Sequence, residues 1–347
     1  MSLKIIDKPT IMALLVAAVF FMENLDATII TTSIPYMAHD FHVTPESLSV
    51  GISAYMISIT VLLPISGWIS DRFGANKIFP LGILIFTLSS ILCALSVNLL
   101  TFTISRVLQG LGGAIMVPVG RLVVLRATDK DGVIKAIAIL TWPALVAPIL
   151  GPVLGGWIST FWGWRWIFLI NIPFGVIAIC MSLIYVVESK KEVERIDVQG
   201  FFLAGLGCCC VMAGIEMASR QNLPILISSF MLISGVVFLF MLYRHVKKYT
   251  KPIFSLSLLT YKTFRVTIVG GSLFRTAVNA APFLVPLTFQ IGFGWSAIEA
   301  GTMLLYLFAG NLLMKLFTTT LINRFGFKKI LLLNGIGGGF VIYFWPF

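Results

Sequence analysis

Two carboxylic acids lie in the middle of an apolar stretch of the sequence. Glu23 and Asp26 fall within residues 11–37 and are three positions apart, which places them on one side of a helix. A carboxylate at the centre of a membrane helix costs about 2.5–3.5 kcal/mol to insert and usually faces a bundle interior or water. The pair is therefore a candidate site for a proton or another cation. A hydrogen-bonded pair with a purely structural role is the alternative.

A basic residue in another apolar stretch could serve these acids. In the run SRVLQGLGGA, Arg106 and Gln109 share a helix face with Gly110 and Gly113. The glycines allow a neighbouring helix to approach closely. Because an arginine does not lose its proton, it needs an acidic or carbonyl partner, and Asp26 is a candidate. Both a coupling role and a structural pairing remain open.

A third motif combines glycine with proline. The segment APILGPVLGGW covers residues 147–157. Its small residues predict a groove for another helix, and its prolines interrupt the helical hydrogen bonds and can kink the helix. The glycines are Gly151, Gly155 and Gly156, and the prolines are Pro148 and Pro152. A Gly-Pro step followed by a second Gly-Gly step is more specific than a lone GxxxG.

A short polar turn separates two apolar stretches at GWISDRFGANK, residues 67–77. Gly67 allows close approach of another helix, and Gly74 allows a tight turn. Asp71 can cap the next helix or pair with a neighbouring arginine, and Arg72 follows it. A simple basic turn facing the cytoplasm is the plainer interpretation.

A weaker copy of this turn appears later in the chain. INRFGFKKIL, residues 322–331, aligns its Arg-Phe-Gly with that of the first turn at an offset of 252 residues. Repeated halves are typical of secondary transporters. The repeat therefore supports a functional interpretation of both turns.

Other polar residues in apolar stretches are less clear. Arg275 and Asn279 are possible cavity residues, as is Gln109, although a structural partner for Arg275 is equally open. Lys315 can extend to the nearby cytoplasmic surface. Glu216 and Arg220 are four residues apart near an outer helix end, where a surface ion pair is expected.

The elements that must position these residues follow from composition. The chain has 347 residues, of which 58% are hydrophobic and only 11% charged, whereas a soluble domain carries about 25% charged residues. Its mean hydropathy is +0.99. These values exclude a soluble enzyme, a disordered chain, a disulfide scaffold and a soluble nucleic-acid binder. We expect an all-α polytopic membrane protein that uses no metal or cofactor, and we find no catalytic motif.

Segment length and hydropathy predict about eleven transmembrane helices. The expected spans are 11–37, 48–69, 78–97, 99–120, 136–158, 166–187, 198–219, 223–243, 266–290, 297–322 and 330–347. The expected domains are a six-helix bundle at 1–187, a connector with two inserted helices at 188–243, a cytoplasmic interfacial link at 244–265, and a partial bundle of three helices at 266–347.

Lys and Arg predict the orientation. With the N-terminus in the cytoplasm, twenty basic residues lie on the cytoplasmic side, and only Arg165 and Arg220 lie outside. The positive-inside rule thus accounts for the net charge of +11 without a nucleic-acid partner. The five cysteines all lie in apolar stretches and are expected to be small hydrophobic residues.

Taken together, the motifs resemble the major facilitator superfamily. LDATIITTSIP at 25–35, the turn at 67–77, SRVLQGLGGA and APILGPVLGG are similar to the fourteen-helix drug/proton antiporters of the EmrB/QacA type, and within them to multidrug transporters. The resemblance runs from about residue 11 to 330. It implies two helical bundles, with an inserted helix pair between them.

The resemblance also implies roles by position. Asp26, with Glu23 nearby, would belong to the proton- or cation-responsive site, and Arg106 would be the coupling arginine. The antiporter motif would be formed by Gly151, Pro152, Gly155 and Gly156. The cytoplasmic gate would be formed by Gly67, Asp71, Arg72 and Gly74.

Several positions depart from the family pattern. Thr31 stands where asparagine is usual, Ala147 replaces a glycine, Ala75 and Asn76 replace basic residues, and Asn323 replaces an acid. A fourteen-helix protein would have three more spans after the final YFWPF. We therefore expect a truncated or frameshifted reading frame.

These observations predict proton-coupled export of small amphipathic or cationic compounds by alternating access. The expected partners are the lipid bilayer of the inner (plasma) membrane, the proton and a small-molecule substrate, with the protein acting as a monomer. A metabolite importer or exchanger of the same superfamily is one alternative. A truncated remnant that does not transport is the other.

Overall fold

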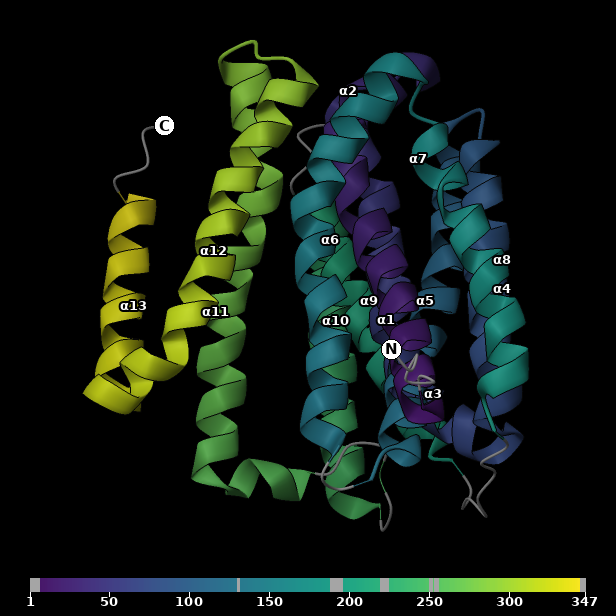
Figure 1. The fold of residues 1–347 in the computed structure, drawn as a ribbon, viewed down its shortest axis with the longest axis vertical. Helices are drawn as coiled ribbons and strands as arrows, with labels where there is room; N and C mark the ends of the chain where they lie inside the picture. Colours follow the sequence, from purple (N-terminus) through teal and green to yellow (C-terminus); the bar gives the residue numbers. More distant parts are fainter. Residues whose placement is uncertain are drawn as a thin grey trace, which may run out of the picture. The chain divides into compact units, whose positions relative to one another are not determined.

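The fold is built from membrane-length helices. The computed structural model describes residues 7–129, 132–187, 196–218, 225–249, 252 and 256–343. Within these ranges every regular element is a helix (Figure 1). Eight of the described helical segments, between Lys8 and Lys248, are long and apolar enough to cross a membrane. The all-α membrane fold expected from composition is confirmed.

The chain divides into two compact units, Met1–Ser257 and Leu258–Phe347. The boundary falls inside the stretch 244–265 expected to link two parts. The helices of the first unit are α1 (Lys8–Ile29), α2 (Ile34–Phe41), α3 (Ser49–Phe73), α4 (Ala75–Ala94), α5 (Leu99–Ala127), α6 (Val133–Phe161), α7 (Trp166–Leu169), α8 (Asn171–Tyr185), α9 (Val198–Ala218) and α10 (Ile225–Lys248). Short 3-10 turns, η1 (Ile30–Thr32) and η2 (Pro45–Leu48), precede α2 and α3.

The second unit contains α11 (Lys262–Leu287), α12 (Ala297–Phe325) and α13 (Phe327–Tyr343), with a π turn, η5 (Thr288–Gly292), after α11. These helices lie where the last three spans were predicted. The link before them differs from expectation, because α10 continues to Lys248 and α11 already begins at Lys262. Between them the described residues form only the 3-10 turn η4 (Leu256–Thr260). Thr250, Lys251 and residues 253–255 lie outside the described part.

Helix α1 is the central element of the first unit. It packs against α5, α6 and α8, while α3 and α4 pack against α5. Its buried residues Val16, Phe20 and Met22 join Phe79 and Phe86 of α4 in one apolar cluster. Most faces of α1 are therefore covered by protein, and polar side chains on it can meet partners from several helices.

Glycines bring α6 against α1. A Cβ at Gly151 would collide with the Thr28 side chain, and one at Gly155 would collide with the carbonyl oxygen of Ile29. The Thr32 hydroxyl donates to the Pro152 carbonyl oxygen at 3.0 Å. The groove predicted from the glycine–proline motif is thus present, and its occupant is α1.

The helix pair α9 and α10 belongs to the first unit. Helix α9 packs between α3 and α10. Near the end of α9, the Glu216 carboxylate accepts hydrogen bonds from the hydroxyls of Ser49 and, at 2.8 Å, Ser53 of α3. Glu216 therefore has α3 as a neighbour, which the expected surface pair did not foresee; Arg220 lies outside the described residues.

The contact between α1 and α6 can be tested with alanine. In a helix, Gly→Ala ordinarily stabilises by about 0.5–1 kcal/mol. Gly67→Ala on α3 should show this gain, because nothing lies within 4 Å of its added methyl group. Gly155→Ala should instead lower the unfolding temperature and the membrane protein level, because the methyl group meets the α1 backbone. Equal unfolding temperatures for the two variants would show that α6 does not pack tightly on α1.

Candidate functional site

An ion pair lies at the centre of the first unit. Arg106 Nη1 on α5 donates to Asp26 Oδ2 on α1 at 2.7 Å. The two side chains are only 1% and 0% exposed. Removing one partner of such a buried pair typically costs about 3–5 kcal/mol, because the other charge is left uncompensated. The geometry supplies the acidic partner that Arg106 was expected to need.

Neutral amides complete the surroundings of the acid. Asp26 Oδ1 accepts from Gln109 Nε2 at 2.9 Å and from Asn171 Nδ2, at the start of α8, at 2.8 Å. Both amides also donate to the Ser90 hydroxyl of α4. The Gln109 carbonyl oxygen turns toward Arg106 Nη1 at 2.6 Å. Gln109, predicted as a possible cavity residue, is a fully buried member of this network.

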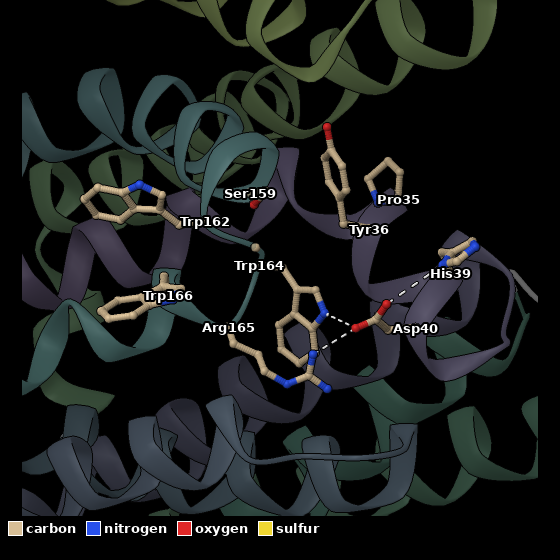
Figure 2. Close-up of a pocket in the computed structure, with 10 residues that line it drawn as sticks. Pro35, Tyr36, His39, Asp40, Ser159, Trp162, Trp164, Arg165 and Trp166 are labelled. Atoms are coloured by element: carbon tan, nitrogen blue, oxygen red, sulfur yellow. Dashed lines mark hydrogen bonds and ion pairs between the residues drawn. The ribbon is translucent and has the colours of Figure 1, made fainter.

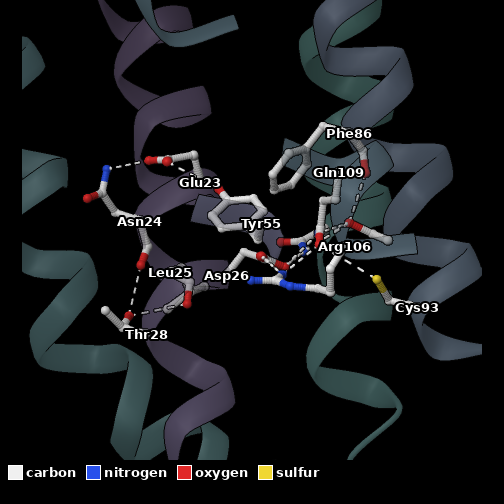
Figure 3. A network of polar contacts seen from close by, with 12 residues as sticks. Glu23, Asn24, Leu25, Asp26, Thr28, Tyr55, Phe86, Cys93, Arg106 and Gln109 are labelled. Carbon is white, nitrogen blue, oxygen red and sulfur yellow. Dashed lines mark hydrogen bonds and ion pairs between the residues drawn. The ribbon is translucent and has the colours of Figure 1, made fainter. Parts of the chain in front are cut away.

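The aromatic ring of Tyr55 covers the arginine. The guanidinium carbon lies 4.2 Å from the ring centroid, a distance at which the ring face attracts a cation. The Tyr55 hydroxyl donates to Glu23 Oε1 at 3.2 Å, and Asn24 Nδ2 donates to Glu23 Oε2 at 3.0 Å. Tyr55 of α3 therefore lies between the two acids of α1, touching Arg106 with its ring and Glu23 with its hydroxyl (Figure 3).

The two acids have different surroundings. Asp26 has a cation and two amide donors, whereas Glu23 accepts hydrogen bonds from the neutral side chains of Asn24 and Tyr55. Glu23 is also half-buried, while Asp26 is fully buried. The site thus holds a fixed charge pair beside a more accessible carboxylate.

The turn between α3 and α4 carries a second ion pair. Arg126 Nη2, in the last turn of α5, donates to Asp71 Oδ1 at 2.5 Å. Of the two roles open to Asp71, the structure shows pairing. The Arg72 guanidinium lies 5.3 Å from the Trp68 ring centroid. Gly74 has φ 93°, the left-handed region that glycine tolerates, and the expected turn is present.

Two other expectations about this turn have different outcomes. The close approach expected at Gly67 is absent among the described residues, since a Cβ there would meet nothing within 4 Å. The second copy of the turn repeats the first: Gly326, between α12 and α13, has φ 82°. In both copies a glycine with positive φ therefore separates two helices.

The remaining candidates are dispersed. Gly156 is buried on α6, and its carbonyl oxygen accepts from Thr160. Arg275 is exposed on α11 of the second unit. The side chains of Asn279, Lys315 and Asn323 lie outside the described part.

An aromatic hollow of about 570 Å³ lies near α2 and the start of α7 (Figure 2). Trp164 Nε1 and Arg165 Nη1 each donate to Asp40 Oδ2 at 2.8 Å. These hydrogen bonds, the tryptophan's first, hold the pKa of Asp40 below its ordinary value of 3.8. Trp164 is buried, and its indole N–H binds the Asp40 carboxylate.

The comparisons agree with this architecture. The family model described as Major Facilitator Superfamily matches residues 16–347. The chain belongs to the major facilitator superfamily. Its members are transporters and not enzymes, so this chain is a multi-pass membrane transporter of a small molecule. The resemblance drawn from its sequence motifs is confirmed.

Two similar proteins bear the provisional name multidrug resistance protein MdtD. They come from Shigella flexneri serotype 5b and Escherichia coli O9:H4. Each is 36% identical over 323 residues, which cover 93% of this chain and 69% of the relative. The chain thus spans about two thirds of their length.

Two solved structures share the fold. The POT family transporter PepTSo has a TM-score of 0.61 at 12% identity, covering 93% of this chain and 70% of its own. The D-xylose–proton symporter has a TM-score of 0.59 at 14% identity, covering 91% and 69%. At these identities the likeness concerns the fold alone.

Sequence reasoning missed several residues of the buried network. Asn171, Ser90 and Tyr55 all contact the Asp26–Arg106 pair or its amides. Asn171 carries a usable signal, since it is an isolated amide in the apolar run IFLINIPFG. Serine and tyrosine are common in membrane helices and gave no comparable signal.

The Asp71–Arg126 pair can be tested by exchanging its charges. Asp71→Arg and Arg126→Asp should each lower the unfolding temperature, and the double variant should recover part of the loss. Both groups are about one quarter exposed, so the coupling should be about 0.2–1 kcal/mol. Strictly additive losses in thermal unfolding would show that the pair contributes nothing.

Proposed function

We propose that this transporter exports small amphipathic or cationic compounds in exchange for protons. The observation that carries the proposal is the buried Asp26–Arg106 pair with Glu23 beside it. Ionisable groups at this depth are costly, and in membrane proteins they mark ion and substrate pathways. The names of the MdtD relatives support multidrug compounds as the substrate class.

The geometry favours a division of work between the two acids. A proton taken up by Asp26 would have to displace Arg106 and two amide donors. A proton taken up by Glu23 would break no ion pair among the described residues. We therefore assign Glu23 as the group that gains and loses the proton, and the Asp26–Arg106 pair as the element that responds to it through Tyr55.

The family resemblance implies Asp26 as the main proton-binding group, whereas the geometry favours Glu23. The two assignments predict different results for variants of these acids. The other motifs keep the roles that the resemblance implies. Gly151, Pro152 and Gly155, with Gly156, would let α1 and α6 move as one body, because the first three contact α1. Asp71, Arg72 and Gly74, with Gly67, would form the cytoplasmic gate. The Asp71–Arg126 ion pair would hold this gate closed.

We further propose that the N-terminus is cytoplasmic, that the membrane is the inner membrane of a bacterium, and that the protein works as a monomer. The basic residues of the α3–α4 turn and of the end of α10 support this orientation. The aromatic hollow at Trp164 would then face the outside.

Transport in inverted vesicles tests the two acids. With Glu23→Gln, uptake of a cationic dye should persist but lose its dependence on the pH gradient, because a neutral amide cannot carry a proton. With Asp26→Asn, uptake should be lost at every pH, because Arg106 keeps an uncompensated charge. Protein level is the control for folding.

Other results would change the assignment. If Asp26→Asn lost only the pH dependence and Glu23→Gln behaved normally, Asp26 would be the proton-binding group. Dye movement down its own gradient, unaffected by the pH gradient in the unmodified protein, would contradict proton coupling altogether.

Orientation is tested with single cysteines in a background whose five native cysteines are alanine. Val97, 71% exposed in the α4–α5 link, should be labelled in intact cells by an impermeant maleimide once changed to cysteine. Lys77→Cys, at the start of α4, should react only after the cells are opened. The reverse pattern would invert the topology.

A further inference from the structure

A hollow between the first turns of α9 and the last turns of α10 gathers basic side chains away from the buried network. Its volume is about 320 Å³. Its lining residues are Gln199, Leu203, Met241, Arg244, His245 and Lys248. None of these described residues is acidic, so the walls offer hydrogen-bond donors and positive charge.

A buried acid fixes one wall of the hollow. Asp197, only 4% exposed, lies just before α9, and its Oδ1 lies 2.8 Å from His245 Nε2. The same oxygen accepts from the backbone N–H of Gly200 at 2.8 Å. The Tyr249 ring stacks on the imidazole at a centroid distance of 5.0 Å. His245 is therefore held in one orientation between two helices.

Basic residues at a helix C-terminus also have a simpler explanation, because they balance the helix dipole and the positive-inside rule favours them. Lys247 fits that explanation: its ammonium group lies 4.6 Å from the Tyr243 ring centroid, and it does not line the hollow. Arg244 and Lys248 differ, since both line the same hollow beside the fixed imidazole.

The part of the hollow farther from the helix ends is apolar. Leu203 and Met241 line it on the membrane side of the basic residues, and Phe202 and Phe240 next to them are 59% and 58% exposed. A ligand with a charged head and an apolar body fits these adjacent basic and apolar surfaces better than a fully polar ion does.

We propose that this hollow is a binding site for a phosphate group, and that its occupant is the headgroup of an anionic phospholipid. Arg244 and Lys248 contact the phosphate, Gln199 donates to it, and the acyl chains lie along the exposed faces of α9 and α10. Arginine suits phosphate oxygens because its donors form a planar fork. Free inorganic phosphate has the same recognition chemistry and is the second possible source. The proposal does not depend on proton coupling or on the direction of transport.

Thermal unfolding of the detergent-purified protein tests the site. Phosphatidylglycerol, phosphatidylcholine and inorganic phosphate are titrated separately, and the concentration that gives half of the maximal rise in unfolding temperature is measured. Phosphatidylglycerol should raise the unfolding temperature more than phosphatidylcholine. Lys248→Gln should increase the half-maximal concentration about five-fold, the equivalent of about 1 kcal/mol. Adding Arg244→Gln should increase it more than tenfold.

Lys247→Gln is the matched control, because it removes one positive charge from the same helical turn without altering the hollow. It should change the half-maximal concentration less than twofold. Equal effects of Lys247→Gln and Lys248→Gln would overturn the site in favour of diffuse surface attraction. Equal responses to the two lipids, with none to phosphate, would also overturn it. A rise with millimolar phosphate that Lys248→Gln removes would support the site with free phosphate as its occupant.

Discussion

The fully buried ion pair between Asp26 and Arg106 is the constraint on which the first unit depends. Both side chains are buried, so the groups that compensate their charges are supplied by the surrounding protein. Amides from α5 and α8 and a ring from α3 contact the pair, and a hydroxyl from α4 accepts from both amides. Arg106 Nε is buried without a hydrogen-bond partner among the described residues. Two charges on α1 and α5 thereby connect five helices, which agrees with the central position of α1 in the first unit.

Sequence alone could predict the helices, the motifs and the membrane class, because hydropathy and unpaired charges in apolar segments are strong signals. It could name Asp26 and Arg106 but could not choose their contacts. Asn171 and Tyr55 join the site only through the angles at which α8 and α3 cross α1 and α5, and those angles depend on packing. The same limitation applies to Arg126. The sequence predicts a cytoplasmic position for it, but does not show that its partner is Asp71.

The glycine positions show the same division between pattern and packing. Gly151 and Gly155 were recognised because they form a motif, and they do contact α1. Gly112 also has a close contact, with the backbone of α4 at Phe86, although the motif analysis of SRVLQGLGGA pointed to Gly110 and Gly113 instead. Gly67 belongs to a motif yet faces open space in the described structure. A glycine's meaning therefore depends on its neighbour, which a single sequence does not reveal.

The hairpin of α4 and α5 has a consequence for how the protein enters the membrane. Its link is short, the α5 N-terminus is closed by the reciprocal hydrogen bonds of Asn98 and Thr101, and the two helices pack against each other. Arg106 lies in the second helix of this hairpin and is synthesised after α4. Asp26 precedes it by 80 residues, so its counter-charge has already left the ribosome. The order of the chain thus spares the translocation machinery a lone arginine in lipid.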